Sequence, residues 1–559
     1  MKKTLLFNPV GVVHARNMPI FSAHMPDWRI RCIYNPKHPW FADGKLRGEG
    51  ENCYFRNNRV PPEAFDGVGA VVLFSAQPRI PHFNIIKDAL FRGIPVIAIE
   101  EIFQMVIEQG FVNEYFLPVD KLLVGSEHER SKFVGIGVPE KVVETVGGVF
   151  RYKEHMPCAP DERRRLIREL GVPDAHRVAT LSLAYLTPSG ETYEVRRKLL
   201  ETVSMGLPNG YSLLVKPHPG ETDSMIREYV TKYAPNAILV DRYLPIDRVL
   251  DITDVLFTRG NSMVVFDALQ RGVPVVAVPV GRRTLFDELC LKDVIARTSG
   301  DVGRCISAVA GNGMDMYKTI FDNFLYIKPE QAVREAVSRI SAIAENNELF
   351  DPGRRLMELA LFWAFMGYNR EGARLLERAH STGNSKSLFE RVRRLVLLRA
   401  TREDLSFLKK WAGCGLGPPG YREWLIQSLW IKSLFAHREN MKAEDAEWLA
   451  DYPPRMNREL FLPYAVLLSW CYLRAGLKAE ARRLAERLHL EYGFINDIRR
   501  VHEHVNVKGK DHRHPVFWFI RRKYGAKEAI RSARYFLFES DNIYEKMSDV
   551  TNDLKRWTK

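Results

Sequence analysis

The sequence has few cysteines and no long apolar run, and these two scarcities restrict the class of protein. Its 559 residues include only 7 cysteines, which are scattered and never form a CxxC pair. This spacing argues against a disulfide framework and against a zinc ribbon. No apolar stretch approaches the roughly 18–20 residues that span a bilayer, and Asn8 and Pro9 end the first apolar run too early for a signal-peptide core. We therefore expect a cytoplasmic protein, whose contact with a membrane would be peripheral and at the inner face.

The net charge of the first 350 residues is also small, because acidic and basic residues nearly balance there. Residues 351–559 contain 39 Lys and Arg against 26 Asp and Glu, which gives +13 of the total net charge of +14. A basic region can contact anionic lipid or an acidic protein, but basic residues that are spread out more often form an ordinary solvated surface. We expect no nucleic-acid partner.

Residues 1–150 alternate short apolar runs with helical stretches. A chain of this length exceeds the size of one hydrophobic core, so several domains are expected. The alternation is typical of a parallel sheet wrapped by helices, and we expect a Rossmann-like domain over 1–150. The expected strands span residues 4–7, 29–34, 70–74, 95–99 and 121–124, with helices over 83–91 and 102–108.

The same pattern returns in residues 165–345, which we expect to form a second Rossmann-like domain. A polar, proline-containing stretch over 152–165 is expected as the linker before it. A long helix over 330–345 is expected to close the second domain. The expected strands span 178–183, 211–215, 237–240, 255–258 and 273–279, with helices over 194–205, 223–232, 246–251 and 263–270.

Strand patterns stop near residue 330, and residues 351–559 are helical in pattern. Two segments, 363–378 and 472–487, resemble each other. In each, an apolar helix ends at a glycine, and a second helix that begins with Glu371 or Glu480 follows. Tetratricopeptide-like (TPR-like) repeats have this layout, in which stacked helix pairs bury a shared core. The predicted fold is therefore α/β, with two Rossmann-like domains followed by an all-α TPR-like domain.

The most specific local signal is the run Lys216, Pro217, His218 and Pro219, directly after an apolar strand. In an open parallel sheet, ligands bind beyond the carboxyl ends of the strands, where this run lies. The prolines stiffen the turn, so the ammonium and the imidazole are held in place. Two such groups suit a phosphate or a base edge. The alternative is a loop histidine that merely ends a strand.

A second signal lies about 40 residues later, in the turn Arg259, Gly260, Asn261 and Ser262. A strand precedes this turn and a helix follows it, and the free N–H groups of a helix N-terminus favour an anion. Ser262 is suited to cap the helix or to bind a phosphate oxygen. Alone, the turn would be an ordinary helix start. Together with the first signal, it predicts a phosphate site.

The two motifs resemble the donor half of GT-B glycosyltransferases, which are built from two Rossmann domains. They are most similar to the group with cytidine-nucleotide donors: bacterial sialyltransferases and polysialyltransferases, capsule Kdo transferases and CDP-glycerol glycerophosphotransferases. The resemblance implies that His218 and Pro219 face the cytidine-phosphate part of the donor and that Ser262 holds its phosphate. Asp267 occupies the place of an acid that reaches the ribose in related UDP-sugar enzymes, although it is equally well a carboxylate on the helix surface.

The resemblance implies a metal-independent glycosyltransferase, with no cofactor besides the nucleotide-sugar donor. The sugar would be a nonulosonic or other keto-sugar acid, moved from a CMP-linked donor to a glycan or protein acceptor, with flagellin as one candidate. Lys216, Arg259 and the helix N-terminus would stabilise the leaving group. A CDP-glycerol glycerophosphotransferase, a UDP-sugar transferase and a 2-epimerase are alternatives, and a non-catalytic scaffold with partner-binding repeats is another.

Candidates for the base that activates the acceptor lie in the N-terminal domain, which the resemblance makes the acceptor side. Glu100 and Glu101 follow the strand over 95–99, and each carboxylate could raise the pKa of the other into the useful range. Two acids at the start of a helix are an equal explanation of this pair. His14, in the loop after the first strand, is the rival candidate.

Overall fold

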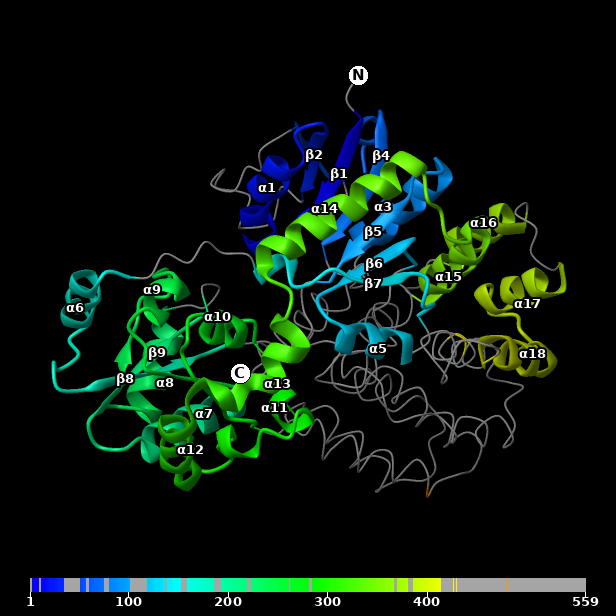
Figure 1. The fold of residues 1–559 in the computed structure, drawn as a ribbon. Coiled ribbons are helices and arrows are strands. Elements are labelled where there is room, and N and C mark those ends of the chain that lie inside the picture. Colours follow the sequence, from blue (N-terminus) through cyan, green and yellow to red (C-terminus); the bar gives the residue numbers. More distant parts are fainter. Residues whose placement is uncertain are drawn as a thin grey trace.

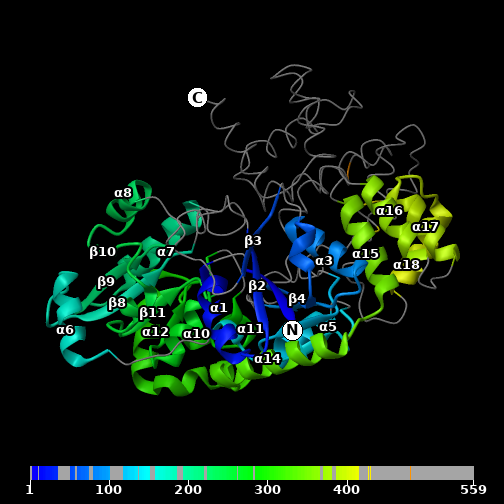
Figure 2. The same ribbon diagram turned by 90° about the horizontal axis from the view of Figure 1, so that it is seen from above.

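Two parallel β-sheets wrapped by helices, followed by a helical region, make up the described part of the chain (Figures 1 and 2). This computed structural model describes residues 3–9, 12–34, 51–56, 60–74, 80–100, 118–135, 138–151, 158–184, 193–218, 223–260, 262–280, 284–365, 369–380, 386–413, 426, 429 and 479. The fold class predicted from the sequence, α/β with two Rossmann-like domains, is confirmed for these residues.

The first sheet has the strand order β3-β2-β1-β4-β5-β6-β7, and every neighbouring pair is parallel. From β1 the chain builds outward in one direction and from β4 in the other, so the topological switch point lies between β1 and β4. The strands are β1 (Thr4–Asn8), β2 (Arg29–Tyr34), β3 (Glu51–Tyr54), β4 (Val68–Phe74), β5 (Val96–Ile99), β6 (Lys121–Val124) and β7 (Val143–Thr145).

Both faces of the first sheet are covered. Alternate side chains of β1 enter two cores: Leu5 and Phe7 pack on one face and Leu6 on the other. Helices α1 (Val12–His24) and α14 (Pro329–Asn346) cover the face of Leu5. Helices α3 (Ile80–Phe91), α5 (Glu127–Gly135) and α15 (Pro352–Phe365) cover the face of Leu6. Such double burial explains the continuous apolar runs in the sequence.

The second sheet has the order β10-β9-β8-β11-β12, again all parallel, with its switch point between β8 and β11. Its strands are β8 (Arg177–Ser182), β9 (Tyr211–Lys216), β10 (Ile238–Leu239), β11 (Val255–Thr258) and β12 (Val275–Ala277). The helices of this part are α6 (Pro160–Glu169), α7 (Tyr193–Gly206), α8 (Asp223–Tyr233), α9 (Ile246–Leu250), α10 (Val264–Gln270), α11 (Leu285–Glu288), α12 (Ser299–Asn312) and α13 (Lys318–Ile320).

The polar stretch predicted as a linker over 152–165 is helical in its second half. Helix α6 begins at Pro160, a favoured first position for proline, and buries Leu166 against Val178 and Leu214 of the second sheet. Its other positions are mostly charged, because only one side of the helix meets the core. The linker prediction is therefore wrong for residues 160–165, whereas residues 152–157 lie outside the described part.

The helix predicted over 330–345 is present as α14, but it does not close the second domain. It runs back across the first sheet, where Val333, Ala336 and Ile340 join the core of Leu5 (Figure 1). Its Arg339 also donates a 2.8 Å hydrogen bond to Glu144 of β7. The amphipathic pattern fixes the buried face of a helix but not the sheet on which it packs.

The helical region continues with α16 (Asn369–His380), α17 (Lys386–Val396) and α18 (Arg402–Gly413). The pair α15–α16 is the first copy of the predicted repeat. Gly372 makes its close approach possible, since a Cβ at this position would lie 2.7 Å from the carbonyl oxygen of Ala360. The second copy, 472–487, lies outside the described residues except for Ala479. The TPR-like assignment therefore stays a prediction.

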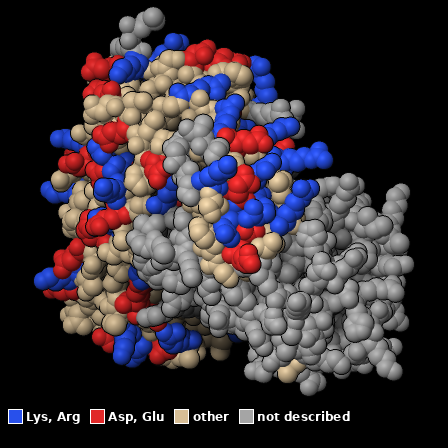
Figure 3. Space-filling model, turned by 90° about the vertical axis from the view of Figure 1, so that its right-hand side faces the viewer, with Lys and Arg blue, Asp and Glu red and all other residues tan. Residues whose placement is uncertain are grey.

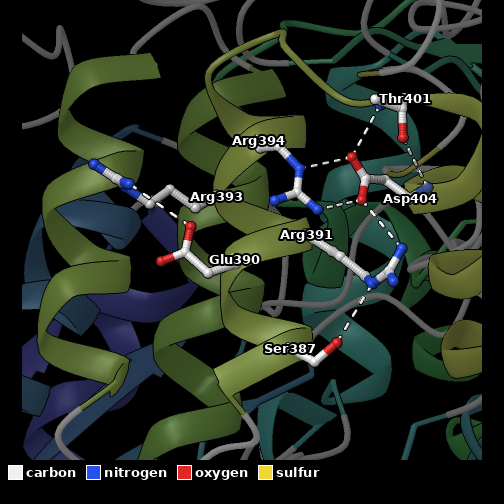
Figure 4. A network of polar contacts seen from close by, with 7 residues as sticks. All are labelled: Ser387, Glu390, Arg391, Arg393, Arg394, Thr401 and Asp404. Carbon is white, nitrogen blue, oxygen red and sulfur yellow. Dashed lines mark hydrogen bonds and ion pairs between the residues drawn. The ribbon is translucent and has the colours of Figure 1, made fainter.

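Basic residues in the described helical region are mixed with acidic ones. Residues 351–413 contain 13 Lys and Arg against 7 Asp and Glu, and Figure 3 shows both signs interspersed on this side of the molecule. Several of the arginines serve internal contacts. The Asp404 carboxylate accepts hydrogen bonds from Arg391, Arg394 and the Thr401 backbone N–H, and Arg394 in particular lowers the pKa of Asp404 to about 2 (Figure 4). Part of the basic charge thus stabilises helix packing.

Of the predicted strands, those over 29–34, 121–124 and 255–258 have the predicted bounds, and the others shift by one or two residues at one or both ends. The sequence patterns missed the short strands β3 and β7 and the helices α1, α5 and α12. The helix predicted over 102–108 lies outside the described residues. In the described part, no helix combines the length and apolar character needed to cross a bilayer.

Candidate functional site

The strand ends of the second sheet bring the two sequence motifs to one edge. Lys216 of β9 pairs with Ser182 of β8. Phe257 of β11 pairs with Leu181, so Thr258 lies level with Ser182. Because β8 separates β9 from β11, the two strand ends are about 10 Å apart at the usual strand spacing. The residues after Lys216 and after Thr258 therefore emerge on either side of β8, next to the switch point between β8 and β11, where ligands bind in such sheets.

Lys216 holds the segment that follows β10. Its Nζ donates hydrogen bonds of 2.7 Å to the carbonyl oxygen of Arg242 and 3.1 Å to that of Pro217. Burial lowers the pKa of this ammonium group to about 8, although the Asp241 carboxylate opposes the shift. Two of the three ammonium donors are engaged, so at most one is left for a phosphate. Lys216 therefore acts first as a positioning residue.

His218 lies two residues past the end of β9 and is half-buried. Pro217 before it is buried and fixes the backbone φ angle, so a stiff turn carries the imidazole. Pro219 lies outside the described residues. The position of His218 suits the predicted contact with a nucleotide, which stays a prediction.

Gly260 has two physical reasons to be glycine. Its φ angle is +85°, in the left-handed region. A Cβ at this position would lie 2.9 Å from the Cβ of Ala277 and 3.1 Å from that of Thr284. Thr284 is the N-cap of α11, so the turn after β11 packs tightly on the segment after β12. The neighbouring Asn261 lies outside the described residues.

Arg259 and Ser262 flank this turn. Arg259 is only 8% exposed, and Ser262 is half-buried. The prediction that Ser262 caps the following helix is wrong: α10 begins at Val264, with Met263 in the N-cap position and no side-chain cap. Ser262 instead contributes its carbonyl oxygen, which accepts a 2.9 Å hydrogen bond from the backbone of Val265. The prediction that the Ser262 hydroxyl binds a phosphate oxygen is separate from the capping prediction and stays a prediction.

Asp267 lies in the first turn of α10 and is half-buried. Its neighbours Phe266 and Ala268 are fully buried, so the helix presents Asp267 on its less buried side. Helix α10 follows the Gly260 turn at the carboxyl edge, so the Asp267 carboxylate lies within one helical turn of this edge. This placement is compatible both with the predicted ribose contact and with a helix-surface acid.

The first domain contains the three predicted base candidates. Glu100 directly follows β5 at the carboxyl edge, is half-buried, and its backbone N–H donates a 2.9 Å hydrogen bond to Leu123. Glu101 lies outside the described residues. His14 is not in a loop, as predicted, but in the first turn of α1, where it is 3% exposed. Its ring centroid lies 5.1 Å from that of Phe74 and 5.2 Å from that of Phe150. His14 is therefore part of an aromatic core.

Arg196 is a residue of this edge that the sequence patterns did not single out. It lies in the first turn of α7 and is 2% exposed. Its Nη2 donates a 3.0 Å hydrogen bond to the carbonyl oxygen of Ala184, two residues past the end of β8. A buried guanidinium thus lies at the end of the strand between β9 and β11. One arginine among the charged residues of a helix start carries no signal in a sequence.

Glu288 connects the second domain to the first. It is the last residue of α11, and its carboxylate accepts a hydrogen bond from Lys132 of α5. The Nε2 atom of His128, also on α5, lies 3.2 Å from the same carboxylate oxygen. Burial raises the pKa of Glu288, but the hydrogen bonds from His128 and Lys132 outweigh it and hold the pKa below its ordinary value. Since Thr284 at the start of α11 touches the Gly260 turn, α11 links the candidate site to the first domain.

The carboxyl edge of the second sheet brings together side chains of the kind that bind phosphate groups. His218, Arg259, Ser262 and Arg196 come to one sheet edge from the ends of β9, β11 and β8. Charge-assisted hydrogen bonds from such groups are the usual means of phosphate recognition. Among the residues that the structure describes, no group of three or more His, Cys, Asp or Glu side chains is arranged to hold a metal ion.

No protein-family model matches the chain, and no curated protein sequence matches it. Among solved structures, the wall teichoic acid polymerase TagF is similar, with 14% identity and a TM-score of 0.42 over 62% of this chain and 89% of that chain. MnaA from S. aureus, in a structure with UDP, has 9% identity and a TM-score of 0.43 over 62% and 96%. UDP-GlcNAc 2-epimerase from Neisseria meningitidis, bound to UDP-GlcNAc, has 10% identity and a TM-score of 0.39 over 62% and 100%. These scores are too low to assign a family.

Proposed function

We propose that this protein is a glycosyltransferase that moves a sugar from a CMP- or CDP-activated donor to a glycan or protein acceptor. One observation carries the proposal: the two sequence motifs meet at the carboxyl edge of the second sheet, on either side of β8. In this proposal His218, Arg259 and Ser262, which follow the ends of β9 and β11, would donate hydrogen bonds to the phosphate of a nucleotide. Arg196, at the end of β8, would add positive charge.

The reaction needs a base on the acceptor side and a stabilised leaving group. A base removes the proton of the acceptor hydroxyl, and the oxygen attacks the sugar carbon that carries the nucleotide. The bond from this carbon to the phosphate oxygen breaks, and the nucleotide leaves with the electron pair. Glu100 is the favoured base, because it lies at the carboxyl edge of the first sheet, whereas His14 is enclosed by Phe74 and Phe150. Arg259 would stabilise the departing phosphate.

The finer assignments belong to the same proposal. We assign the donor sugar to the nonulosonic or keto-sugar acids, with CDP-glycerol and UDP-sugars as alternative donors. The helical region over 351–559 is proposed to recognise the acceptor, and its basic surplus to favour peripheral contact with an anionic membrane. The proposed chemistry uses no metal and no cofactor besides the activated donor.

A thermal shift experiment with CMP, CDP and UDP tests this function. A ligand that binds the folded state raises the melting temperature, and the rise grows with the logarithm of the ligand concentration relative to its Kd. Stabilisation by CMP or CDP but not by UDP supports a cytidine-nucleotide donor, and stabilisation by UDP alone supports the UDP-sugar alternative. If no nucleotide raises the melting temperature, the transferase proposal is refuted, and a scaffold built on two Rossmann domains takes its place.

A further inference from the structure

Tyr243 is an exposed aromatic residue at the edge where the donor is proposed to bind. It follows β10 by four residues and is 66% exposed. Among the large hydrophobic residues that the structure describes, only Met205, at 76%, is more exposed. A single exposed aromatic ring is common on protein surfaces, so the contacts and the position of Tyr243 decide whether it has a role.

The main chain around Tyr243 is held in one conformation by three hydrogen bonds. The Tyr243 backbone N–H donates to the Asp241 carboxylate at 2.8 Å, and the Leu244 N–H donates to the Asp241 carbonyl oxygen at 3.1 Å. Lys216 fixes the carbonyl oxygen of Arg242 from the neighbouring strand. The exposed ring is therefore carried by an ordered turn.

One side of the Tyr243 ring is already occupied. The guanidinium carbon of Arg242 lies 4.5 Å from the ring centroid, and Nη2 of Arg242 donates a 2.7 Å hydrogen bond to the tyrosine hydroxyl. A guanidinium at this distance makes a cation–π contact and orients the ring. Since the residue is nevertheless 66% exposed, the rest of the ring faces solvent. Such a surface is suited to stack on another flat ring.

The sheet register places this ring next to the first motif. Leu239 of β10 pairs with Val215 of β9, so Val240 lies level with Lys216. Tyr243 and His218 therefore leave neighbouring strands, about 4.8 Å apart, on the same edge of the sheet. The other phosphate-binding candidates, Arg196, Arg259 and Ser262, lie on the far side of β9, around β8 and β11. A nucleotide with its phosphate at β11 would extend its base across β9 toward β10.

We propose that Tyr243 is the platform on which the pyrimidine ring of the donor nucleotide stacks, with Arg242 on the other side of the tyrosine ring. This inference rests on the proposed function and adds a residue that recognises the base. Stacking on an aromatic ring accepts any base, so Tyr243 contributes affinity for the nucleoside, and the selection of cytosine over uracil falls to other groups.

Isothermal titration of CDP and of ribose 5-phosphate into the full-length protein tests the platform. Tyr243→Ala should weaken CDP binding about tenfold or more and leave ribose 5-phosphate binding unchanged, because ribose 5-phosphate lacks a base. Tyr243→Phe keeps the ring and should bind CDP nearly as tightly as the unaltered protein. Tyr54→Ala, at a tyrosine that is 45% exposed on the first sheet, is the matched control and should have no effect.

The outcomes separate this inference from the function on which it rests. If the unaltered protein binds CDP and Tyr243→Ala binds it equally well, the platform is refuted and the proposed function stands. An equal loss of CDP and ribose 5-phosphate binding also refutes the platform, because Tyr243 would then act through the phosphate site. If the unaltered protein binds neither CMP, CDP nor UDP, the proposed function fails first. Melting temperatures of the variants should be unchanged, since the ring is mostly exposed.

Discussion

Asp120 and Arg355 form a buried ion pair between the first sheet and the helical region. Asp120 is 3% exposed and Arg355 is 1% exposed. The Asp120 carboxylate also accepts hydrogen bonds from the backbone N–H groups of Val96, at 2.7 Å, and Phe350, at 2.8 Å. The Nε atom of Arg355 donates to the carbonyl oxygen of Pro118 at 2.9 Å. Helix α15 is thus part of the first domain's core, and deletion of residues 351–559 would remove part of that core.

Removal of one member of this pair should destabilise the protein strongly. In Arg355→Met, the Asp120 carboxylate stays buried without its cationic partner, and we expect the free energy of unfolding to fall by roughly 3–5 kcal/mol. Urea denaturation followed by circular dichroism measures the change. Arg334→Met is the control, because Arg334 pairs with Glu330 on the surface of α14, and it should change stability by less than about 0.5 kcal/mol. Equal effects of the two substitutions would contradict this account.

Gly260 and Gly272, on either side of α10, allow the effect of backbone strain to be compared with the effect of a steric clash. Gly260 and Gly272 both have positive φ angles, of +85° and +71°, but a Cβ on Gly272 would meet nothing within 4 Å. We expect Gly272→Ala to cost about 1–2 kcal/mol of stability through the backbone alone. Gly260→Ala should cost more, because its Cβ would lie 2.9 Å from that of Ala277, and it should also weaken nucleotide binding. Denaturation measures the loss of stability, and titration with CDP measures the affinity for the nucleotide. If Gly260→Ala binds CDP as tightly as Gly272→Ala, the nucleotide does not bind next to the Gly260 turn.

Burial of Lys216 predicts a dependence of stability on pH. Its pKa falls to about 8 in the folded protein, against about 10.4 in an unfolded chain. Between these values the unfolded chain binds more protons at this residue, so the contribution to stability rises with pH from about 8 to about 10. Over this range, the unfolding free energy of the unaltered protein should therefore rise with pH relative to that of Lys216→Met. A difference that is independent of pH would mean that Lys216 is not desolvated.

Two histidines at opposite edges of the second sheet provide a matched test of the nucleotide site. His218 lies past the carboxyl end of β9, whereas His176 precedes β8 and its Nδ1 lies 3.0 Å from Oγ of Ser212. We expect His218→Ala to weaken CDP binding about tenfold or more, the usual worth of a hydrogen bond to a charged group. His176→Ala should bind CDP normally in the same titration. The reverse pattern would place the ligand at the amino edge.

Central elements of the fold could be predicted from the sequence because their signals are local. The strand β11 and the end of α3 are examples. The three apolar residues of β11 and the buried Thr258 are bounded by Asp254 and Arg259, and Gly93, with φ of +66°, follows the end of α3 before β5 begins. The turns at Lys216 and Arg259 were also predicted correctly at the carboxyl edge, because parallel strands all end at the same edge of a sheet.

Features that depend on distant partners could not be predicted. Helix α14 shows a buried face in its sequence, but nothing local indicates that Ile340 packs on the first sheet. The polar sequence of α6 conceals a helix that buries little besides Leu166. The engagement of Lys216 with the carbonyl oxygen of Arg242 depends on the register of β9 and β10. His14 was expected in a loop, but it lies in the first turn of α1, a helix that contains Pro19.

A crystal structure of the protein with CDP bound tests the central claim most directly. The account predicts that the phosphates lie past the ends of β8 and β11, within hydrogen-bond distance of Ser262 and Arg259, with His218 beside the nucleotide. A nucleotide bound at the first sheet, or at the amino edge of the second, would contradict the assignment of this edge as the donor site.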